Sequence, residues 1–106
     1  MSAPVTPLPT PWGPAVSVEQ IAPGIVFVET ASHGGFYLDE TRNGQVPEHW
    51  RRASFNRRAL DGWYEEDCDA CLIVVAFPQE FPAEALPRAK LCFDRWFKPK
   101  LQGEYL

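Results

Sequence analysis

The feature that most constrains this chain is one apolar run, Ala70–Phe77, which follows a group of acids and ends at Pro78. In a chain of 106 residues, such a run has to lie in the centre of one small core and be covered by the remaining residues. The acids at 65–67 stand where the start of a helix favours negative charge, and the apolar residues after them recur at helical spacing. These patterns predict a helix over 64–76. The β-branched residues Ile73-Val74-Val75 leave a buried strand as the alternative.

Composition and charge exclude several classes of protein. The chain is 45% hydrophobic, which is enough for a single core, and its net charge is −4. This balance argues against direct binding of nucleic acid, because such binding needs an excess of Lys and Arg to neutralise phosphate. The apolar run is too short for a membrane span and the N-terminus lacks a secretory signal, so we expect a cytoplasmic protein with no membrane partner. Its three cysteines are then expected to be reduced.

The N-terminal segment is rich in proline. Prolines recur at positions 4, 7, 9, 11 and 14, a spacing that is expected to form no helix and to donate no sheet ladder. We therefore predict an extended arm over residues 1–11 and a single domain over residues 12–106. Trp12 is expected to dock the end of the arm onto this domain, because a large indole ring is unfavourable in water.

Three strands are predicted before residue 40. Residues 15–21 alternate between polar and apolar, residues 25–30 are rich in β-formers, and residues 36–38 begin a third strand. The turns between them are expected at Ala22-Pro23-Gly24 and at Ser32-His33-Gly34-Gly35. The short connections indicate an antiparallel meander.

Helices are predicted in the second half of the chain. Asp39 can cap a helical turn over 41–44, and Pro47 can begin another over 48–53. Pro87 is suited to the first position of a last helix that runs to Phe97, and residues 100–106 are expected to form a tail. The predicted fold is therefore α+β, with an antiparallel three-stranded meander packed against two to three helices.

His33 and the two glycines after it form the first candidate for chemistry. Paired glycines let a backbone approach a ligand closely, and a histidine can act as acid, base or metal ligand near neutral pH. The structural alternative is a hairpin turn in which Gly34 and Gly35 supply positive φ and His33 bonds locally.

The acids Glu65, Glu66 and Asp67, with Asp61 and Asp69 on either side, form the second candidate. Neighbouring carboxylates can raise one another's pKa and act as acid and base, or they can collect a divalent cation. The structural alternative is the acidic start of a helix. No calcium-loop pattern is present, so no metal is predicted.

The pair Cys68-x-x-Cys71 is interpreted as part of the core. The residues that flank Cys68 are acids, which disfavour the thiolate that redox chemistry needs. A second cysteine pair that would complete a zinc site is also absent from the sequence.

Five motifs of the sequence are informative when they are taken together: Trp12-Gly13, Ile21–Phe27, Thr30–Phe36, Arg42-Asn43 and Gly62–Cys68. They resemble an uncharacterised family of small domains, the domain of unknown function DUF7007. The resemblance covers about residues 12–78. It implies carriage on proteobacterial plasmids, integrative elements and phages, and it supplies no catalytic residues.

The function we expect from these observations is inhibition of a host defence system, of the anti-CRISPR or anti-restriction type. The protein would bind a nuclease or CRISPR effector subunit through an acidic face, without catalysis and without a cofactor. The residues predicted to form the binding site are His33, Trp63, Tyr64, Glu65, Glu66, Asp67 and Asp69.

Two alternatives remain open. The first is a small hydrolase or metal-dependent enzyme that uses His33 with Glu65, Glu66 or Cys68. The second is a structural or self-associating module, such as a homodimer, in which His33 bonds an acid of 65–67 and fastens the hairpin to the helix. The relation of His33 to residues 63–68 in space decides among these functions.

Overall fold

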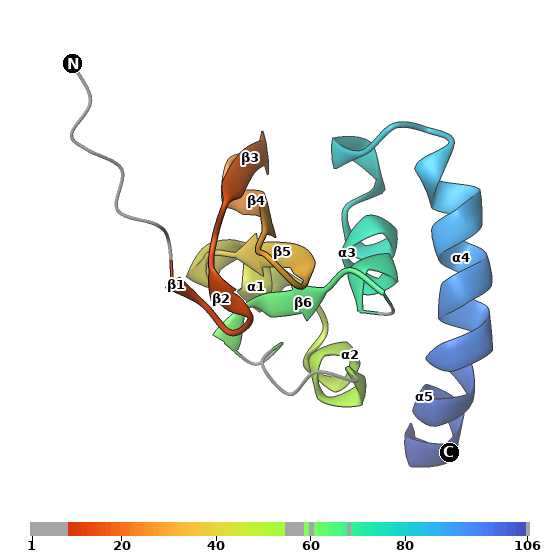
Figure 1. Ribbon diagram of the computed structural model, residues 1–106. Coiled ribbons are helices and arrows are strands. Elements are labelled where there is room, and N and C mark those ends of the chain that lie inside the picture. Colours follow the sequence, from red (N-terminus) through yellow and green to blue (C-terminus); the bar gives the residue numbers. More distant parts are fainter. Residues whose placement is uncertain (1–8, 55–58, 60, 68, 106) are drawn as a thin grey trace.

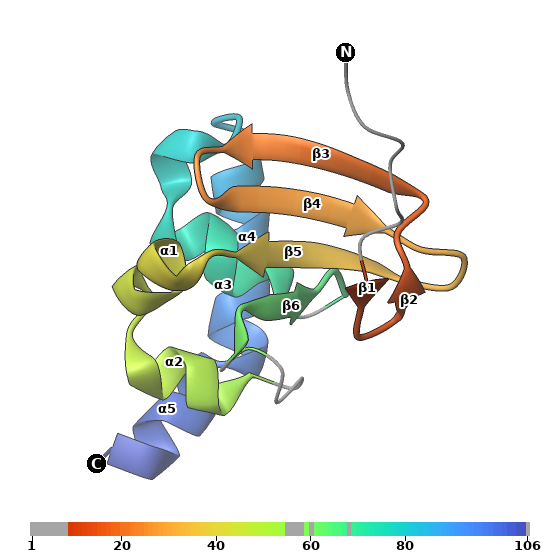
Figure 2. The same ribbon diagram turned by 90° about the vertical axis from the view of Figure 1, so that its left-hand side faces the viewer.

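The computed structural model describes residues 9–54, 59, 61–67 and 69–105, and it describes side chains up to residue 101. A four-stranded antiparallel sheet forms its centre. Its strands are β3 (Ser17–Ala22), β4 (Ile25–Glu29), β5 (Gly34–Leu38) and β6 (Trp63–Glu65), and they lie in that order. Figure 2 shows the sheet face-on. The predicted α+β class and the three-stranded meander are confirmed. The sheet also has a fourth strand, β6, that the sequence did not indicate.

The helices of residues 70–76 and 85–96 lie on one face of this sheet (Figure 1). Helix α3 (Ala70–Ala76) packs against β5 and β6, and α4 (Ala85–Trp96) packs against α3 as a further layer. The shorter helices α1 (Glu40–Gln45) and α2 (Glu48–Ala53) follow β5, and a 3₁₀ turn, η2 (Pro78–Glu80), follows α3. None of the helices that the structure describes is long and apolar enough to cross a membrane.

Local sequence signals account for several of these boundaries. The Asp39 side chain accepts a hydrogen bond from the Arg42 backbone N–H at 2.8 Å and caps α1, as predicted. Helix α2 has the predicted bounds. Gly24 has φ 81°, so the turn between β3 and β4 uses the backbone conformation that glycine allows.

Helix α3 begins later than predicted. Tyr64 and Glu65, expected in a helix over 64–76, lie in β6 instead, and the helix begins at Ala70. The edge of β5 offers backbone hydrogen bonds to these residues. A pattern of helical periodicity depends only on nearby residues and therefore cannot indicate a strand partner that is distant in the sequence. The interpretation of Ile73-Val74-Val75 as helix rather than buried strand is confirmed.

The C-terminal segment also differs from the prediction. Helix α4 begins at Ala85, two residues before Pro87, and residues expected to form a tail are helical in α5 (Lys98–Tyr105). Pro99 lies in the first turn of α5, where its missing N–H leaves no hydrogen bond unmade. Lys100 donates from Nζ to the carbonyl of Ala53 at 2.5 Å and ties α5 to α2.

The prolines of the arm do not prevent a short ladder. β1 (Pro9–Thr10) pairs with β2 (Gly13–Pro14), against the prediction that this segment donates no sheet ladder. The Thr10 hydroxyl closes the turn, donating to Gly13 O at 2.6 Å and accepting from Trp12 N–H at 3.0 Å. Residues 1–8 of the predicted arm lie outside the described residues. Figure 2 shows the β1–β2 hairpin beside the end of the sheet, away from α3 and α4.

The core lies between the sheet and the helices. It holds Ile25, Phe36 and Leu38 from the sheet with Leu72, Ile73 and Phe97 from the helices, and each is almost fully buried. The apolar run at 70–77 thus occupies the centre of the protein as expected, with Leu72 and Ile73 at 0% exposure.

Candidate functional site at the junction of β5 and β6

The two motifs that the sequence singles out are adjacent in space. β5, which contains Gly34 and Gly35, pairs directly with β6, which contains residues 63–65. In this register Gly35 lies opposite Glu65, and the Glu66 backbone N–H donates to Gly34 O at 3.0 Å. The motifs are therefore joined by backbone hydrogen bonds.

Gly34 and Gly35 allow this close approach. A Cβ on Gly35 would lie 2.4 Å from the carbonyl oxygen of Tyr64 and 2.5 Å from the Trp12 ring. A Cβ on Gly34 would lie 2.8 Å from the Glu66 carboxylate. Both glycines lie in a strand, and neither has positive φ. The prediction that they form a turn with positive φ was therefore wrong, and the space they leave is filled by this chain.

His33 lies in the exposed turn just before β5. Thr30 holds this turn, since its hydroxyl donates to His33 O at 2.8 Å and accepts from His33 N–H at 3.0 Å. Within the part of the chain that the structure describes, the imidazole makes no hydrogen bond to Glu65, Glu66 or Asp67. The two motifs are therefore joined by the pairing of β5 with β6, and not by the predicted hydrogen bond from His33 to an acid of residues 65–67.

An aromatic cluster covers the face of the sheet opposite to the helices. Trp12 and Trp63 meet edge to face with ring centroids 5.8 Å apart, and Trp63 and Tyr37 lie 4.6 Å apart. Tyr37 and Trp63 are directly opposite each other in the β5–β6 register, so they share this face. Trp12 docks onto the domain as predicted, and Trp63 is half-buried among these rings.

Tyr64 points to the other face of the sheet and is fully buried. Its hydroxyl donates to Asn43 Oδ1 at 2.5 Å, and Asn43 Nδ2 donates to Ala59 O at 3.1 Å. Burial raises the pKa of this phenol well above its usual range; the Arg51 charge lowers it and the Asp69 charge raises it. The structure therefore places this predicted binding residue in the interior.

Asp69 is also in the interior, at 1% exposure. Its Oδ2 accepts a hydrogen bond from the Ser54 hydroxyl at 2.6 Å, which joins the start of α3 to the end of α2. A buried carboxylate needs such donors because desolvation of its charge is unfavourable. Like Tyr64, Asp69 is not presented to a partner in this structure.

Glu65, Glu66 and Asp67 remain at the surface. Glu66 and Asp67 are exposed in the turn after β6, and Glu65 is half-buried on the sheet. The pKa of Glu65 is raised, mainly by burial and then by the hydrogen bond with Asp67 and its charge, with a smaller effect of Asp69. The charge of His33 acts in the opposite direction and lowers the pKa of Glu65.

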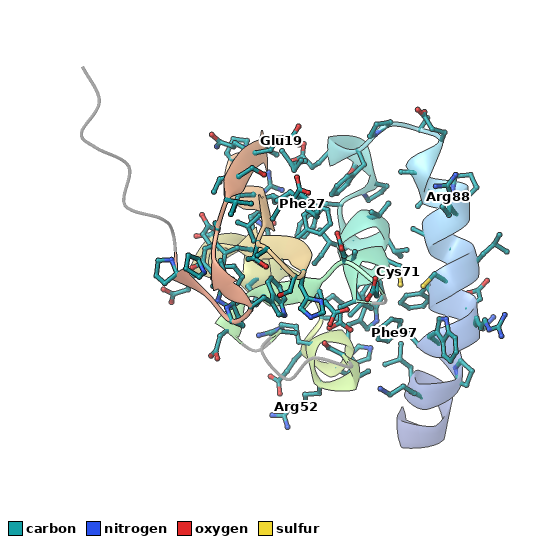
Figure 3. All side chains as sticks on the ribbon, in the orientation of Figure 1. Glu19, Phe27, Arg52, Cys71, Arg88 and Phe97 are labelled. Atoms are coloured by element: carbon teal, nitrogen blue, oxygen red, sulfur yellow. The ribbon has the colours of Figure 1, made fainter. Side chains whose placement is uncertain are left out.

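A groove of about 290 Å³ begins at this acidic turn and runs between α3 and α4. Figure 3 shows Cys71 on α3 and Arg88 on α4, which both line it. Its walls are mostly small apolar side chains, with Glu66 and Asp67 on one rim and Arg88 as a cation. The apolar lining is Ala70, Cys71, Val74, Ala85, Ala89 and Cys92. Sequence reasoning did not find this groove, because it depends on how two helices pack.

The cysteines fit the core interpretation as far as they are described. Cys71 is buried and Cys92 is half-buried, while Cys68 lies outside the described residues. Among residues 9–54, 59, 61–67 and 69–105, no group of three or more His, Cys, Asp or Glu side chains is arranged to hold a metal ion.

Comparison with known proteins gives one result. A family profile described as "Domain of unknown function (DUF7007)" matches residues 5–101. No curated protein and no solved structure matches the chain. The family match extends over both motifs, the aromatic cluster and the groove, beyond the stretch in which the resemblance was seen in the sequence.

Proposed function

Because the chain belongs to the DUF7007 family, whose description names no activity, we propose a function from its surface: it binds another protein through the acidic turn at 65–67. The observation that carries this proposal is the position of Glu66 and Asp67. Both are exposed, and both lie on the rim of a groove with an apolar lining. Negative charge beside apolar surface suits a Lys or Arg side chain, whose methylene stem can cover apolar atoms while its head group pairs with the carboxylates.

The size of the acidic face limits the mode of binding. Asp69 is buried, so the surface acids of this segment are Glu65, Glu66 and Asp67. Three carboxylates are too few to imitate a length of phosphate backbone, but they can engage one or two basic side chains of a partner. Trp63 and Glu65 lie two residues apart in β6 and so share one face of the sheet. Tyr64 and Asp69 contribute by holding β6 and α3 in position.

The partner we propose is a host defence protein, a nuclease or a CRISPR effector subunit. This proposal rests on the small size of the chain, its net charge of −4 and the link of the resembled family with phages and plasmids. Such effectors carry basic grooves for nucleic acid, and a small acidic protein that occupies part of one would compete with phosphate. Action in the cytoplasm, without a cofactor, forms part of the same proposal.

The experiment uses a charge reversal with a matched control. Glu66→Lys with Asp67→Lys changes the net charge by the same amount as Glu19→Lys with Asp94→Lys, whose side chains are exposed elsewhere. The wild-type chain and the control are expected to relieve restriction or CRISPR interference in a transformation assay and to co-purify with the same effector subunit. The reversal at 66 and 67 is expected to lose both effects. Wild-type defence in the presence of the unmodified chain, with no effector subunit recovered, would refute the proposal.

Self-association is a second candidate function, supported by the edge of the sheet. Among the strands that the structure describes, β3 pairs only with β4, and Val16 before it and Val18 within it are 71% and 52% exposed. An exposed edge with apolar side chains can pair with the same strand of a second copy. Light scattering at increasing protein concentration tests this candidate: a homodimer that Val18→Lys dissociates would support it, and a monomer at every concentration would exclude it.

A hydrolase that uses His33 gains less support from the structure. Glu65 has a raised pKa, as a catalytic carboxyl group can have, and the charge of His33 acts on it. His33 nevertheless lines neither described cavity, and a catalytic pair needs a site where substrate is held against it. We therefore place protein binding first.

A further inference from the structure

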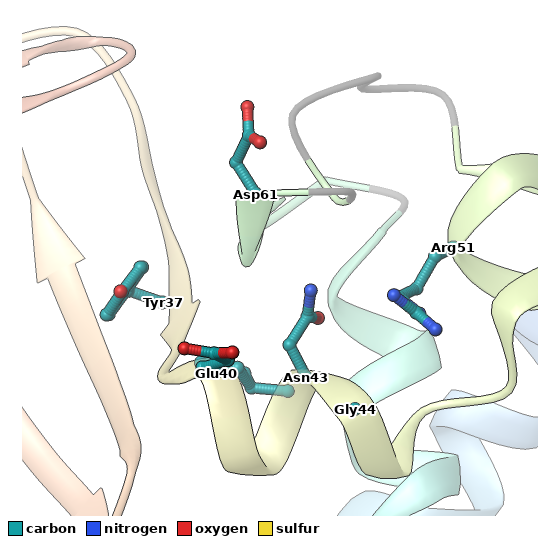
Figure 4. A pocket seen from close by; sticks show the side chains of 7 residues that line it. Tyr37, Glu40, Asn43, Gly44, Arg51 and Asp61 are labelled. Atoms are coloured by element: carbon teal, nitrogen blue, oxygen red, sulfur yellow. The ribbon is translucent and has the colours of Figure 1, made fainter.

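A second cavity, of about 340 Å³, lies where the end of β5 meets α1 and α2. It is far more polar than the groove beside α3. The side chains that matter for its chemistry are Tyr37, Glu40, Asn43, Arg51 and Asp61, and Gly44 also lines it (Figure 4). Nothing in the proposed protein contact uses this cavity.

Opposite charges line the cavity. Arg51 comes from α2 and Glu40 from α1, and Figure 4 shows them on either side of Asn43. The Arg51 Nε–H donates to Val46 O at 3.1 Å, which fixes the plane of the guanidinium and leaves its terminal N–H groups for another acceptor. Among the described residues, neither Arg51 nor Glu40 forms an ion pair.

The floor of the cavity is rigid. Asn43 is 7% exposed, and its amide is held by Tyr64 and Ala59 through the hydrogen bonds described above. A buried amide that is bonded on both sides keeps its position without a ligand. The charged groups therefore project from helices whose positions are fixed by the core.

Gly44 provides an independent indication that this space is kept open. It lies inside α1, where glycine is less favourable than alanine, and its φ is not positive. A Cβ built on Gly44 would meet no atom of the described residues within 4 Å. Among those residues, neither backbone conformation nor packing requires glycine here. Because Gly44 lines the cavity, we expect a longer side chain at this position to extend into it.

From these observations we propose that the cavity binds a small zwitterion of the amino-acid class. The ligand's carboxylate pairs with the terminal N–H groups of Arg51, and its ammonium group pairs with Glu40, with Asp61 adding negative charge at the rim. The Tyr37 ring forms a wall for the rest of the molecule. A volume of about 340 Å³ is near the lower limit for ligand sites, which suits a free amino acid.

The first experiment measures binding to the whole chain. Individual amino acids are screened by thermal shift, and those that stabilise the protein are titrated by calorimetry. Each is compared with its decarboxylated amine and its N-acetyl form, which lack one of the two charges. The proposal expects the amino acid to bind and each single-charge analogue to bind at least about tenfold more weakly, because each loses a charge-assisted hydrogen bond. No binding by any amino acid would overturn it.

Variants of the cavity provide the second test. Arg51→Met and Glu40→Gln are expected to weaken binding by at least about tenfold. Arg52→Met is the matched control, because Arg52 is the next residue, is exposed and pairs with Glu48 outside the cavity. Gly44→Leu fills the cavity and is expected to abolish binding while circular dichroism shows a folded protein. Unchanged binding in Glu40→Gln and Gly44→Leu would overturn the proposal even if Arg51→Met failed to fold.

Discussion

The contact between β5 and β6 can be tested by making the same substitution at two glycines. In Gly35→Ala, the new Cβ would lie 2.4 Å from Tyr64 O and 2.5 and 2.9 Å from two atoms of the Trp12 ring. Tyr64 O is a backbone atom of the paired strand, so relief requires β6 to move away from β5. Gly44→Ala places the same methyl group where no atom of the described residues lies within 4 Å.

The two substitutions should change stability in opposite directions. Forcing an extra carbon into a packed site costs about 1–3 kcal/mol, and we expect Gly35→Ala near the upper end because the nearest contact is with backbone. Gly44→Ala should stabilise the protein by about 0.5–1 kcal/mol, because alanine is the better helix former. The free energy of unfolding of a small domain is about 5–15 kcal/mol, so the loss expected for Gly35→Ala is a large fraction of it.

Urea unfolding followed by tryptophan fluorescence measures both values. The expected result is a lower midpoint for Gly35→Ala and a higher one for Gly44→Ala, with a slope like that of the wild type. Adding Trp12→Leu to Gly35→Ala should recover only part of the loss, since it removes the ring contact and leaves the contact with Tyr64 O. A wild-type midpoint for Gly35→Ala would refute the inference that this glycine is required by the approach of β6.

Three further substitutions test the junction. Tyr64→Phe removes the hydrogen bond to Asn43 and should cost about 1–3 kcal/mol in urea unfolding, whereas Tyr37→Phe, at a half-buried ring, should cost much less. His33→Ala should change stability by no more than about 0.5 kcal/mol, because its side chain is exposed and only its backbone holds the turn; a melting temperature several degrees lower would show that the ring fastens the junction. The pKa of Glu65 in the folded state is raised above its usual value of 4.5, so the folded state favours the protonated carboxyl group. This contribution to stability is present in acid and is lost as the pH rises through the folded-state pKa. Glu65→Gln should therefore lessen the fall in stability from pH 4.5 towards neutral pH, and melting curves identical to those of the wild type across this range would contradict it.

Local signals in the sequence were sufficient for much of the fold. Asp39 and Pro47 marked the starts of two helices, and the alternation over 15–21 and the β-formers over 25–30 marked two strands and their turn. Each signal depends on neighbours within a few residues, such as a side chain that caps its own helix. The same local rules placed Tyr64 and Glu65 in a helix, because nothing near them reveals that β5 offers an unpaired edge.

The candidate site was predicted as a set of residues but not as an arrangement. Glu66 and Asp67 are at the surface as expected, whereas Tyr64 and Asp69 face the interior. A strand presents alternate residues to opposite faces, so the change from helix to β6 decided which residue was buried. The polar cavity was missed altogether, although Gly44 within a short helical segment was a signal that could have led to it.

By itself, the sequence determined the α+β class, the apolar run at 70–77 that forms the core, the negative charge, and two motifs, His33-Gly34-Gly35 and Trp63–Asp67. Those features depend on composition and on short-range periodicity, which the chain carries in any conformation. Only the tertiary structure decided what the two motifs do together. They meet because β6 pairs with β5. The absence of a side chain at Gly35 lets both the Trp12 ring and the backbone of β6 lie close to this residue. Contacts between residues about thirty positions apart arise from packing the whole chain, and no local pattern encodes them.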